Sequence, residues 1–294
     1  MIIDAHCHLW LKQDGRVNGR PVYSIGGGRS DFGGEIRQML PPYMTDGSNT
    51  AELLLSNMDF AGVNCAVVTQ EYIDGCQNDY LRGISERFDG RIKACSLYSE
   101  EMRDDEIETD GFDGIKICAG RLSDGDLSNH ARVFELAAKS GRFISIDLAE
   151  GDSQCGALAE ISDSYPSLRI AIGHFGMVGR DGWREQIKLA RRANIYIESG
   201  GITWLYNSEF YPYPSAVRAI REAAELVGYD KLMWGSDYPR TMTAITYAMS
   251  LDFVKDSREI AEADKSRFLG ENARRFYGFD EMPDIARIKH MAED

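Results

Sequence analysis

The chain has 294 residues, of which 43% are hydrophobic and 27% are charged. This composition is typical of a globular protein with a full core and excludes disordered and fibrous classes. The 47 acidic residues outnumber the 33 basic ones and leave a formal net charge of −14, which repels phosphate backbones and anionic lipids. We therefore expect a small-molecule substrate as the partner, and neither nucleic acid nor a membrane.

The N-terminal sequence MIIDAHCHLW has no basic start, no long apolar stretch and no small-residue cleavage site, so it does not match a secretory signal. No run of residues reaches the ~18 apolar positions needed to cross a bilayer. The six cysteines are far apart and lack CxxC spacing, which favours reduced thiols over disulfides or a cysteine-built zinc site. These features predict a cytoplasmic protein.

Short apolar runs, each followed by a segment with helical periodicity, recur along the whole chain. The expected strands are Met1–His6, Val63–Thr69, Ile92–Leu97, Gly114–Cys118, Phe143–Leu148, Arg169–His174, Asn194–Ser199 and Lys231–Ser236. Amphipathic helices are expected between them, among others at Thr50–Ala61, Ser128–Ser140, Trp183–Ala193 and Pro214–Val227. Eight such units predict an α/β protein whose parallel sheet closes into a (β/α)8 TIM barrel, a single domain over residues 1–294.

A doubly wound open sheet is the alternative architecture. It is disfavoured because the first strand leads into no G-x-G-x-x-G fingerprint. Polar residues instead collect at the ends of many strands, as they do around the mouth of a barrel.

The connection after the first strand is unusually long, and residues 10–49 are interpreted as a structureless lid or specificity loop over the barrel mouth. Its run Gly26-Gly27-Gly28 lacks the Lys-Ser/Thr ending of a phosphate-binding loop, so flexible surface is the better interpretation of these glycines. At the other end, residues 280–294 are expected to form a charged helical tail. A tail packed at a subunit contact would permit a homodimer.

Two histidines lie at the end of the first expected strand, His6 and His8. Side chains two apart on a strand point to the same face. Both imidazoles can therefore converge on one point at the barrel mouth, as two ligands of one metal do. The spacing alone permits core or surface histidines equally well.

Two further polar residues come at the ends of later strands. His174 ends the sixth expected strand and Asp237 follows the eighth, so a barrel brings both to the rim where the first strand ends. A carboxylate after so apolar a strand is costly unless it is paired or bound to a metal. The alternatives are that Asp237 caps the following helix and that His174 is a packed core histidine.

Several specific motifs occur in order along the chain: IDAHCH (3–8), MDFAGV (58–63), YPSL (165–168) leading into IGHFG (172–176), WGSDYP (234–239) and ENARRFYG (271–278). Together they resemble the amidohydrolase superfamily, in particular its amidohydrolase-related branch of lactonases and non-oxidative decarboxylases, over nearly the whole chain. The resemblance implies a (β/α)8 barrel with His6 and His8 as metal ligands. It also implies Asp237 as metal ligand and proton acceptor, and His174 as the residue that polarises a substrate carbonyl or relays a proton.

The chain departs from this pattern at the end of the fifth strand, where metal-dependent members usually carry another histidine and this chain has Asp147. A carboxylate also binds zinc or manganese, so Asp147 is interpreted as a further ligand of one divalent ion, with zinc preferred. The ion is favoured because Asp147 and Asp237 would otherwise repel each other in a dry barrel. A metal-free enzyme is the alternative, since some similar lactonases keep the histidine pair without a metal.

Candidate substrate contacts follow other strands. Arg121, Arg180 and Arg240 come after the fourth, sixth and eighth strands, where a guanidinium group can hold a carboxylate in a bidentate pair. Lys116 lies within the fourth strand and must point into the site or against a helix. Trp204 is a candidate wall of the pocket, with packing against outer helices as the alternative. These residues favour a carboxylated or sugar-derived substrate, although a single arginine is more often a surface residue.

Three functions fit this set of residues. The preferred one is a metal-dependent hydrolase that activates water for attack on a small lactone, ester or amide carbonyl. The second is a non-oxidative decarboxylase that releases carbon dioxide from a small carboxylic acid at the same site. The third is a binding or regulatory protein built on a barrel that has lost its activity.

Overall fold

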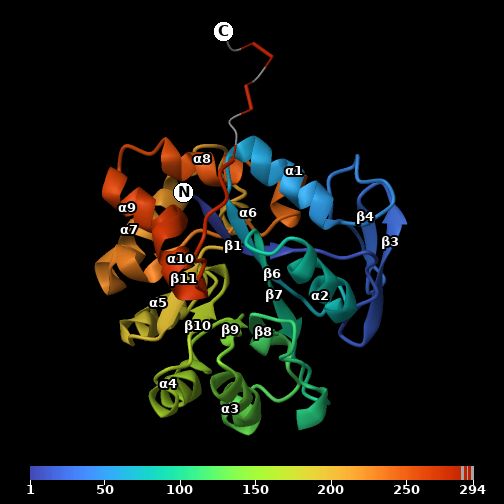
Figure 1. Ribbon diagram of the computed structural model, residues 1–294, viewed down its shortest axis with the longest axis vertical. Helices are drawn as coiled ribbons and strands as arrows, with labels where there is room; N and C mark the ends of the chain where they lie inside the picture. The colour runs from blue at the N-terminus through green and yellow to red at the C-terminus, as the bar shows by residue number, and fades with distance from the viewer. Residues whose placement is uncertain (286–287, 290, 293–294) are drawn as a thin grey trace.

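The computed structural model describes residues 1–285, 288–289 and 291–292. Eight parallel strands stand in one sheet in which neighbours in sequence are neighbours in space, and the sheet curls into a barrel (Figure 1). The strands are β1 (Ile3–His8), β6 (Cys65–Thr69), β7 (Ile92–Leu97), β8 (Gly114–Ile117), β9 (Phe143–Ile146), β10 (Ile170–Ile172), β11 (Ile195–Glu198) and β12 (Leu232–Met233). The predicted (β/α)8 barrel is confirmed, and every expected strand overlaps an observed one.

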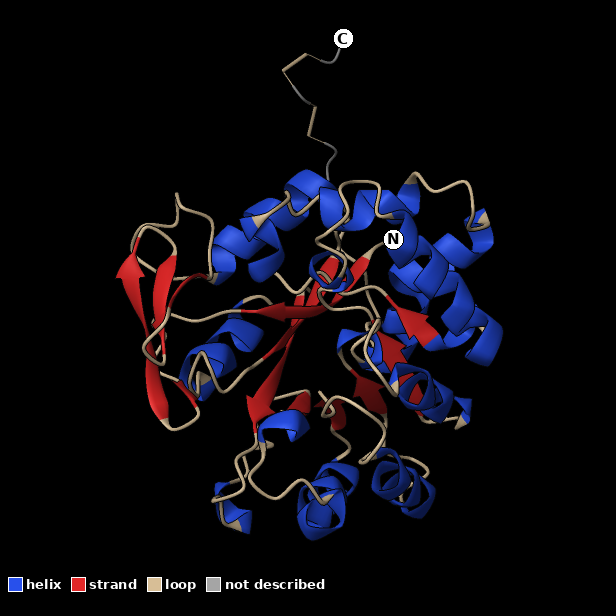
Figure 2. Cartoon of the chain, turned by 180° about the vertical axis from the view of Figure 1, so that it is seen from behind, coloured by secondary structure: helices blue, strands red, loops and turns tan. Residues whose placement is uncertain are grey.

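Helices surround the barrel on its outer side (Figure 2). They are α1 (Ala51–Ala61), α2 (Asn78–Arg87), α3 (Ala131–Ser140), α4 (Cys155–Ser164), α5 (Trp183–Lys188), α6 (Ile202–Leu205), α7 (Pro214–Val227), α8 (Met249–Lys255), α9 (Glu262–Ser266) and α10 (Asn272–Tyr277). The longest, α7, has proline at its first turn, where the missing N–H costs no helical bond. It buries Val217, Ile220 and Ala223 on one face, and burial of each large apolar side chain contributes about 1.5–3 kcal/mol.

The first and last strands meet along a seam that closes the barrel. The amide of Ala5 donates to the carbonyl of Trp234 at 2.9 Å, and the amide of His8 donates to that of Tyr238 at 2.8 Å. In return, the amide of Asp237 donates to the carbonyl of His6 at 2.8 Å. These bonds fix the backbone of the last strand's end directly beside the two histidines of the first strand.

Asp4 holds the same seam from within. It is fully buried, and its carboxylate accepts from the amide of Ser236 at 2.8 Å, from the hydroxyl of Ser236 at 2.5 Å and from the hydroxyl of Tyr247 at 2.9 Å. Burial raises the pKa of Asp4 to about 6, although these hydrogen bonds act in the opposite direction. A buried carboxylate with this many donors is a structural clamp.

The prediction of a structureless loop over residues 10–49 is wrong. The segment contains a separate four-stranded antiparallel sheet at the side of the barrel, made of β2 (Arg16–Val17), β3 (Arg20–Gly26), β4 (Arg29–Phe32) and β5 (Ile36–Gln38) (Figure 1). Two of the glycines that were interpreted as flexible surface, Gly27 and Gly28, form the turn between β3 and β4, and Asn18-Gly19 forms the turn between β2 and β3. Asn18-Gly19 and Gly27-Gly28 all have positive φ, which two-residue hairpin loops of the primed type require.

This side sheet is attached to the barrel through a buried polar chain. The hydroxyl of Ser30 in β4 donates to Gln13 Oε1 at 2.6 Å, and Gln13 Nε2 donates to Asp74 Oδ1 at 3.0 Å. All three side chains are buried. Because buried polar groups that satisfy one another resist separation, the sheet is a fixed wall beside the barrel mouth.

The predicted helical tail is also not found where the structure describes it: residues 280–285, 288–289 and 291–292 form no helix, and the rest of the prediction lies outside the described residues. Pro283 lacks the amide donor that a helix interior needs. Among the described residues, the helices are all too short or too polar to span a membrane.

The burial pattern predicts a contrast between two isoleucines. Ile197→Ala in β11 removes a side chain with no exposure and should lower the free energy of unfolding by about 2–5 kcal/mol. Ile36→Ala in β5 removes one that is 65% exposed and should change it by no more than about 0.5 kcal/mol. Urea titration measures both values, and equal losses would contradict this fold.

Candidate active site at the barrel mouth

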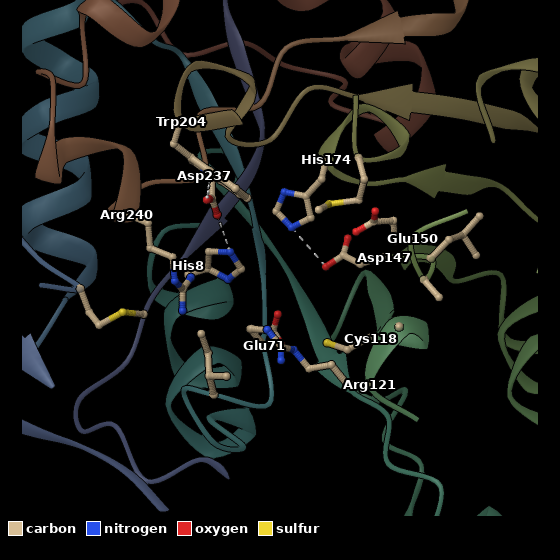
Figure 3. A pocket seen from close by; sticks show the side chains of 16 residues that line it. His8, Glu71, Cys118, Arg121, Asp147, Glu150, His174, Trp204, Asp237 and Arg240 are labelled. Carbon is tan, nitrogen blue, oxygen red and sulfur yellow. Dashed lines mark hydrogen bonds and ion pairs between the residues drawn. The ribbon is translucent and has the colours of Figure 1, made fainter. Parts of the chain in front are cut away.

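His6, His8 and Asp237 point toward one another across the seam, and Figure 3 shows His8 beside Asp237 at the wall of a cavity. His6 Nε2 and His8 Nε2 are 3.0 Å apart. Asp237 Oδ1 lies 3.0 Å from His8 Nε2 and 3.8 Å from His6 Nε2. Two strands that are more than 220 residues apart in the chain thus bring three potential metal ligands to a single point.

The charge states of this group follow from its surroundings. Burial lowers the pKa of His8 to about 3, and Arg240 acts in the same direction, so its ring is neutral. Burial alone would raise the pKa of Asp237, but a hydrogen bond with His8 and nearby positive charges outweigh it and lower that pKa. The indole of Trp204 donates to the second carboxylate oxygen of Asp237 at 2.6 Å. Asp237 is therefore an oriented, ionised carboxylate.

Glu198, at the end of β11, orients His6. Its Oε1 accepts from His6 Nδ1 at 2.6 Å, and its Oε2 accepts from the amide of Gly200 at 2.5 Å. A proton held on Nδ1 leaves the lone pair of His6 Nε2 facing His8 and Asp237, as metal-binding histidines supported by carboxylates do. The sequence-based prediction missed Glu198, although an acidic residue ending the apolar run Ile195-Tyr196-Ile197 was a visible signal.

His174, which follows β10, lies between Asp237 and Asp147 at the cavity (Figure 3), and its ring centroid is 4.8 Å from that of His6. Its Nδ1 donates to the carbonyl of Gly200 at 2.9 Å, which leaves Nε2 facing Asp147 Oδ2 at 3.5 Å. Burial alone would lower the pKa of His174, but Asp147 outweighs it and raises that pKa to about 10. At neutral pH, His174 thus presents a charged N–H donor to the cavity.

Asp147, which follows β9, has a cation of its own. The ammonium group of fully buried Lys116 lies 2.7 Å from Asp147 Oδ2. Burial disfavours the charged form of both side chains. The opposite charge of the partner outweighs this effect, so the pKa of Lys116 is raised and the pKa of Asp147 is lowered. The sequence-based argument that repulsion between Asp147 and Asp237 calls for a metal is therefore wrong, because Lys116 already compensates Asp147.

The donor set of His6, His8 and Asp237 fits a divalent ion. Ligands bound tetrahedrally at about 2.1 Å lie about 3.4 Å from one another, and the three donor atoms here are 3.0–3.8 Å apart. Two imidazoles and one carboxylate suit zinc, and manganese accepts the same atoms. Asp147 forms a second group of potential ligands with His6 and Glu198, whose ligand atoms lie within 4.8 Å of one another, and its role as a further ligand stays a prediction.

The cavity has a volume of about 360 Å³. It is lined by His8, Met39, Glu71, Ile73, Cys118, Gly120, Arg121, Asp147, Leu148, Ala149, Glu150, His174, Met177, Trp204, Asp237 and Arg240. Within the segment 10–49, Met39 lines the cavity, and it directly follows β5.

Two of the three predicted arginines lie at the cavity, and both are already paired. Arg121 Nε lies 2.8 Å from Glu71 Oε1, and Arg240 Nη2 lies 2.6 Å from Asp74 Oδ2. Arg180 is exposed and does not line the cavity, so its expected position at the site is wrong. It lies in the connection between the short turn His174–Gly176 and α5. The carboxylate partners of Arg121 and Arg240 are Glu71 and Asp74, which follow β6. The sequence analysis missed them because sequence spacing gives no sign of this pairing.

A family model described as amidohydrolase matches residues 3–279 of the chain. None of the proteins of curated function matches it.

Solved structures resemble the chain in fold. A probable 2-pyrone-4,6-dicarboxylic acid hydrolase from Acinetobacter baumannii, with citric acid bound, is 18% identical, with a TM-score of 0.70 over 94% of this chain and 99% of that chain. An amidohydrolase from Burkholderia multivorans with bound zinc is 16% identical, with a TM-score of 0.67 over 96% of this chain and 100% of that chain. The 5-carboxyvanillate decarboxylase of Sphingomonas paucimobilis is 17% identical, with a TM-score of 0.57 over 79% of this chain and 84% of that chain.

The packing behind the cavity predicts that Gly173 cannot carry a side chain. Its φ of −79° suits any residue, but an added Cβ would lie 2.0 Å from Asp147 Oδ1 and 2.7 Å from Glu198 Oε1. We expect Gly173→Ala to lower the free energy of unfolding by about 1–3 kcal/mol. The control is Gly83→Ala in α2, where nothing lies within 4 Å and a gain of about 0.5–1 kcal/mol is expected. A neutral Gly173→Ala would show that the two walls are looser than described.

Proposed function

Because the chain belongs to the amidohydrolase family, whose model matches residues 3–279, we propose that it is a hydrolase that opens a small lactone, ester or amide with water. The observation that carries this proposal is the convergence of His6, His8 and Asp237 on one side of the cavity. His174, a charged donor, lies beside this group, with its ring centroid 4.8 Å from that of His6. A carbonyl group bound in front of these residues meets a base and an acid at once.

Asp237 is proposed as the general base. It is ionised, and the Trp204 hydrogen bond fixes its orientation. Asp237 takes a proton from a water molecule while the water oxygen forms a bond to the carbonyl carbon. A positioned base of this kind contributes roughly 10²- to 10⁴-fold to the rate.

His174 is proposed as the electrophile and acid. Its Nε2–H stabilises the negative charge that develops on the carbonyl oxygen. When the carbon–oxygen bond of a lactone or ester breaks, the leaving oxygen takes a proton from His174; in an amide, the leaving nitrogen does so. The product is the hydroxy acid, or the acid together with the alcohol or amine. Lys116 acts through Asp147, because this ion pair keeps Asp147 charged beside His174.

One divalent ion, zinc in preference to manganese, is proposed to bind at His6, His8 and Asp237. When bound, such an ion lowers the pKa of a coordinated water from 15.7 towards ~7 and so supplies the nucleophile at neutral pH. Glu198 supports this role by keeping the Nε2 lone pair of His6 available.

Decarboxylation is the second candidate. The observation that favours it is the same protonated His174 at the cavity wall, because loss of carbon dioxide leaves a carbanion that must be protonated. Carbon dioxide release separates the two reactions directly.

Metal binding gives a test that does not depend on turnover. We expect the purified protein to bind one zinc ion in equilibrium dialysis, and His8→Ala to weaken binding by more than the roughly 10- to 100-fold that loss of a supporting partner costs. His130→Ala is the matched control, since His130 is buried against Tyr98 at 2.9 Å and is no part of this group. Equal zinc binding by His8→Ala and the unmodified protein would rule out the proposed ligand set.

The base is tested by Asp237→Asn, which keeps the shape and removes the proton acceptor. Assayed on a panel of lactones by acid release, kcat/KM should fall at least about 100-fold. Glu150→Gln, which removes a carboxylate elsewhere on the cavity wall, should keep most of the activity. Undiminished turnover in Asp237→Asn, or carbon dioxide as the product, would contradict the assignment.

A further inference from the structure

Both arginines at the cavity are held by carboxylates of one loop, residues 70–77, between β6 and α2. Glu71 engages Arg121, and Asp74 engages Arg240. Asp74 is 3% exposed and is held from its other side by Gln13, so the Arg240 pair is locked inside the protein. Arg240 also faces Asp237, which raises the pKa of the arginine further against the effect of burial.

Arg121 is the more accessible of the two guanidinium groups. Its side chain is 38% exposed, and it lies where the cavity adjoins a second hollow of about 830 Å³, which shares Gly120 and Arg121 with it. A ligand carboxylate could reach this arginine, but Glu71 already occupies its Nε edge at 2.8 Å. Glu71 is itself fixed, because its Oε1 also accepts from the amide of Tyr72 at 2.8 Å.

The positive charges of the lining are all paired with carboxylates. Glu71, Asp147, Glu150 and Asp237 line the cavity together with the two arginines and His174, and His174 Nε2 lies 3.5 Å from Asp147 Oδ2. An incoming carboxylate would have to displace Glu71 from Arg121 or lie beside it, and like charges at such a distance repel each other. The partner it would displace is tethered to the same protein and so has a high effective concentration.

From this arrangement we propose that Glu71 is a specificity-determining residue, which neutralises Arg121 and so selects uncharged lactones, esters or amides over their carboxylated analogues. The inference rests on the proposed function, because it concerns the substrate of the same cavity. It replaces the sequence-based expectation that Arg121 and Arg240 bind a substrate carboxylate. Arg121 becomes a latent carboxylate site that the Glu71 side chain keeps closed.

The test uses a matched pair of five-membered lactams, pyroglutamate and pyroglutamamide, which differ only in a carboxylate against a carboxamide. Their dissociation constants are measured by isothermal titration calorimetry with the full chain. The unmodified protein should bind the uncharged lactam more tightly. Glu71→Gln keeps an oxygen that can accept from the Tyr72 amide but removes the negative charge that neutralises Arg121, so it should shift the preference toward pyroglutamate by about tenfold.

Two further variants separate this effect from a general change of charge. Glu150→Gln removes the same charge from the lining of the cavity, but none of the arginines that the structure describes pairs with Glu150, so the preference should shift less than about twofold. Arg121→Met in the Glu71→Gln background should abolish the gain. Glu71→Ala also removes the carboxylate that neutralises Arg121 and should shift the preference in the same direction, so it decides the question even if Glu71→Gln does not fold.

Three results would overturn the proposal. One is an undiminished gain of pyroglutamate binding in the double variant Glu71→Gln/Arg121→Met, because the ligand carboxylate would then not be bound by Arg121. Another is an equal shift in Glu150→Gln and Glu71→Gln. The third is the absence of binding of either lactam at millimolar concentration, because the cavity must accept the uncharged ring. Failure of the hydrolase itself is seen separately, as no turnover of any lactone despite the expected binding preference.

Discussion

The seam between β1 and β12 is the constraint on which the whole site depends. Backbone bonds from Ala5, His8 and Asp237 join the first strand to the last, and Asp4 secures them with bonds to Ser236 and Tyr247. No sequence-local structure could bring His8 within 3.0 Å of Asp237. Barrel closure therefore does two things at once: it removes the open edges of the sheet, and it assembles the three donor atoms.

Around this seam, the buried charges of the mouth occur in pairs, each drawn from different strands or loops. Glu198 supports His6, Lys116 compensates Asp147, and the loop after β6 holds the two arginines. A buried ion without a partner costs several kcal/mol, whereas a paired one is tolerated. Asp237 and His174, which face the cavity, are the base and the acid of the proposed chemistry.

Much of this architecture could be predicted from sequence, because the signals are local. Apolar runs such as Ile170–Ile172 mark buried parallel strands, and the two-residue spacing of His6 and His8 puts their rings on one face. The side sheet was predictable in principle, because Asn18-Gly19 is a hairpin turn signal. It was missed when glycine was interpreted as flexibility alone.

The pairing of charges could not be predicted in the same way. Glu71 and Arg121 are 50 positions apart, and nothing in the residues near either one specifies the other. Whether a rim arginine is free for substrate or held by the protein depends on which loops fold over the mouth, and loops vary independently of the barrel. The same limit explains why Arg180 looked equivalent to Arg121 in sequence but lies away from the cavity.

The most direct test of the central claim is anomalous X-ray diffraction at the zinc absorption edge, on crystals grown with zinc. One peak should lie about 2.0–2.2 Å from His6 Nε2, His8 Nε2 and an oxygen of Asp237, with Lys116 still paired to Asp147. A peak coordinated by Asp147 in place of Asp237, or no peak beside the two histidines, would contradict the metal centre at the barrel seam.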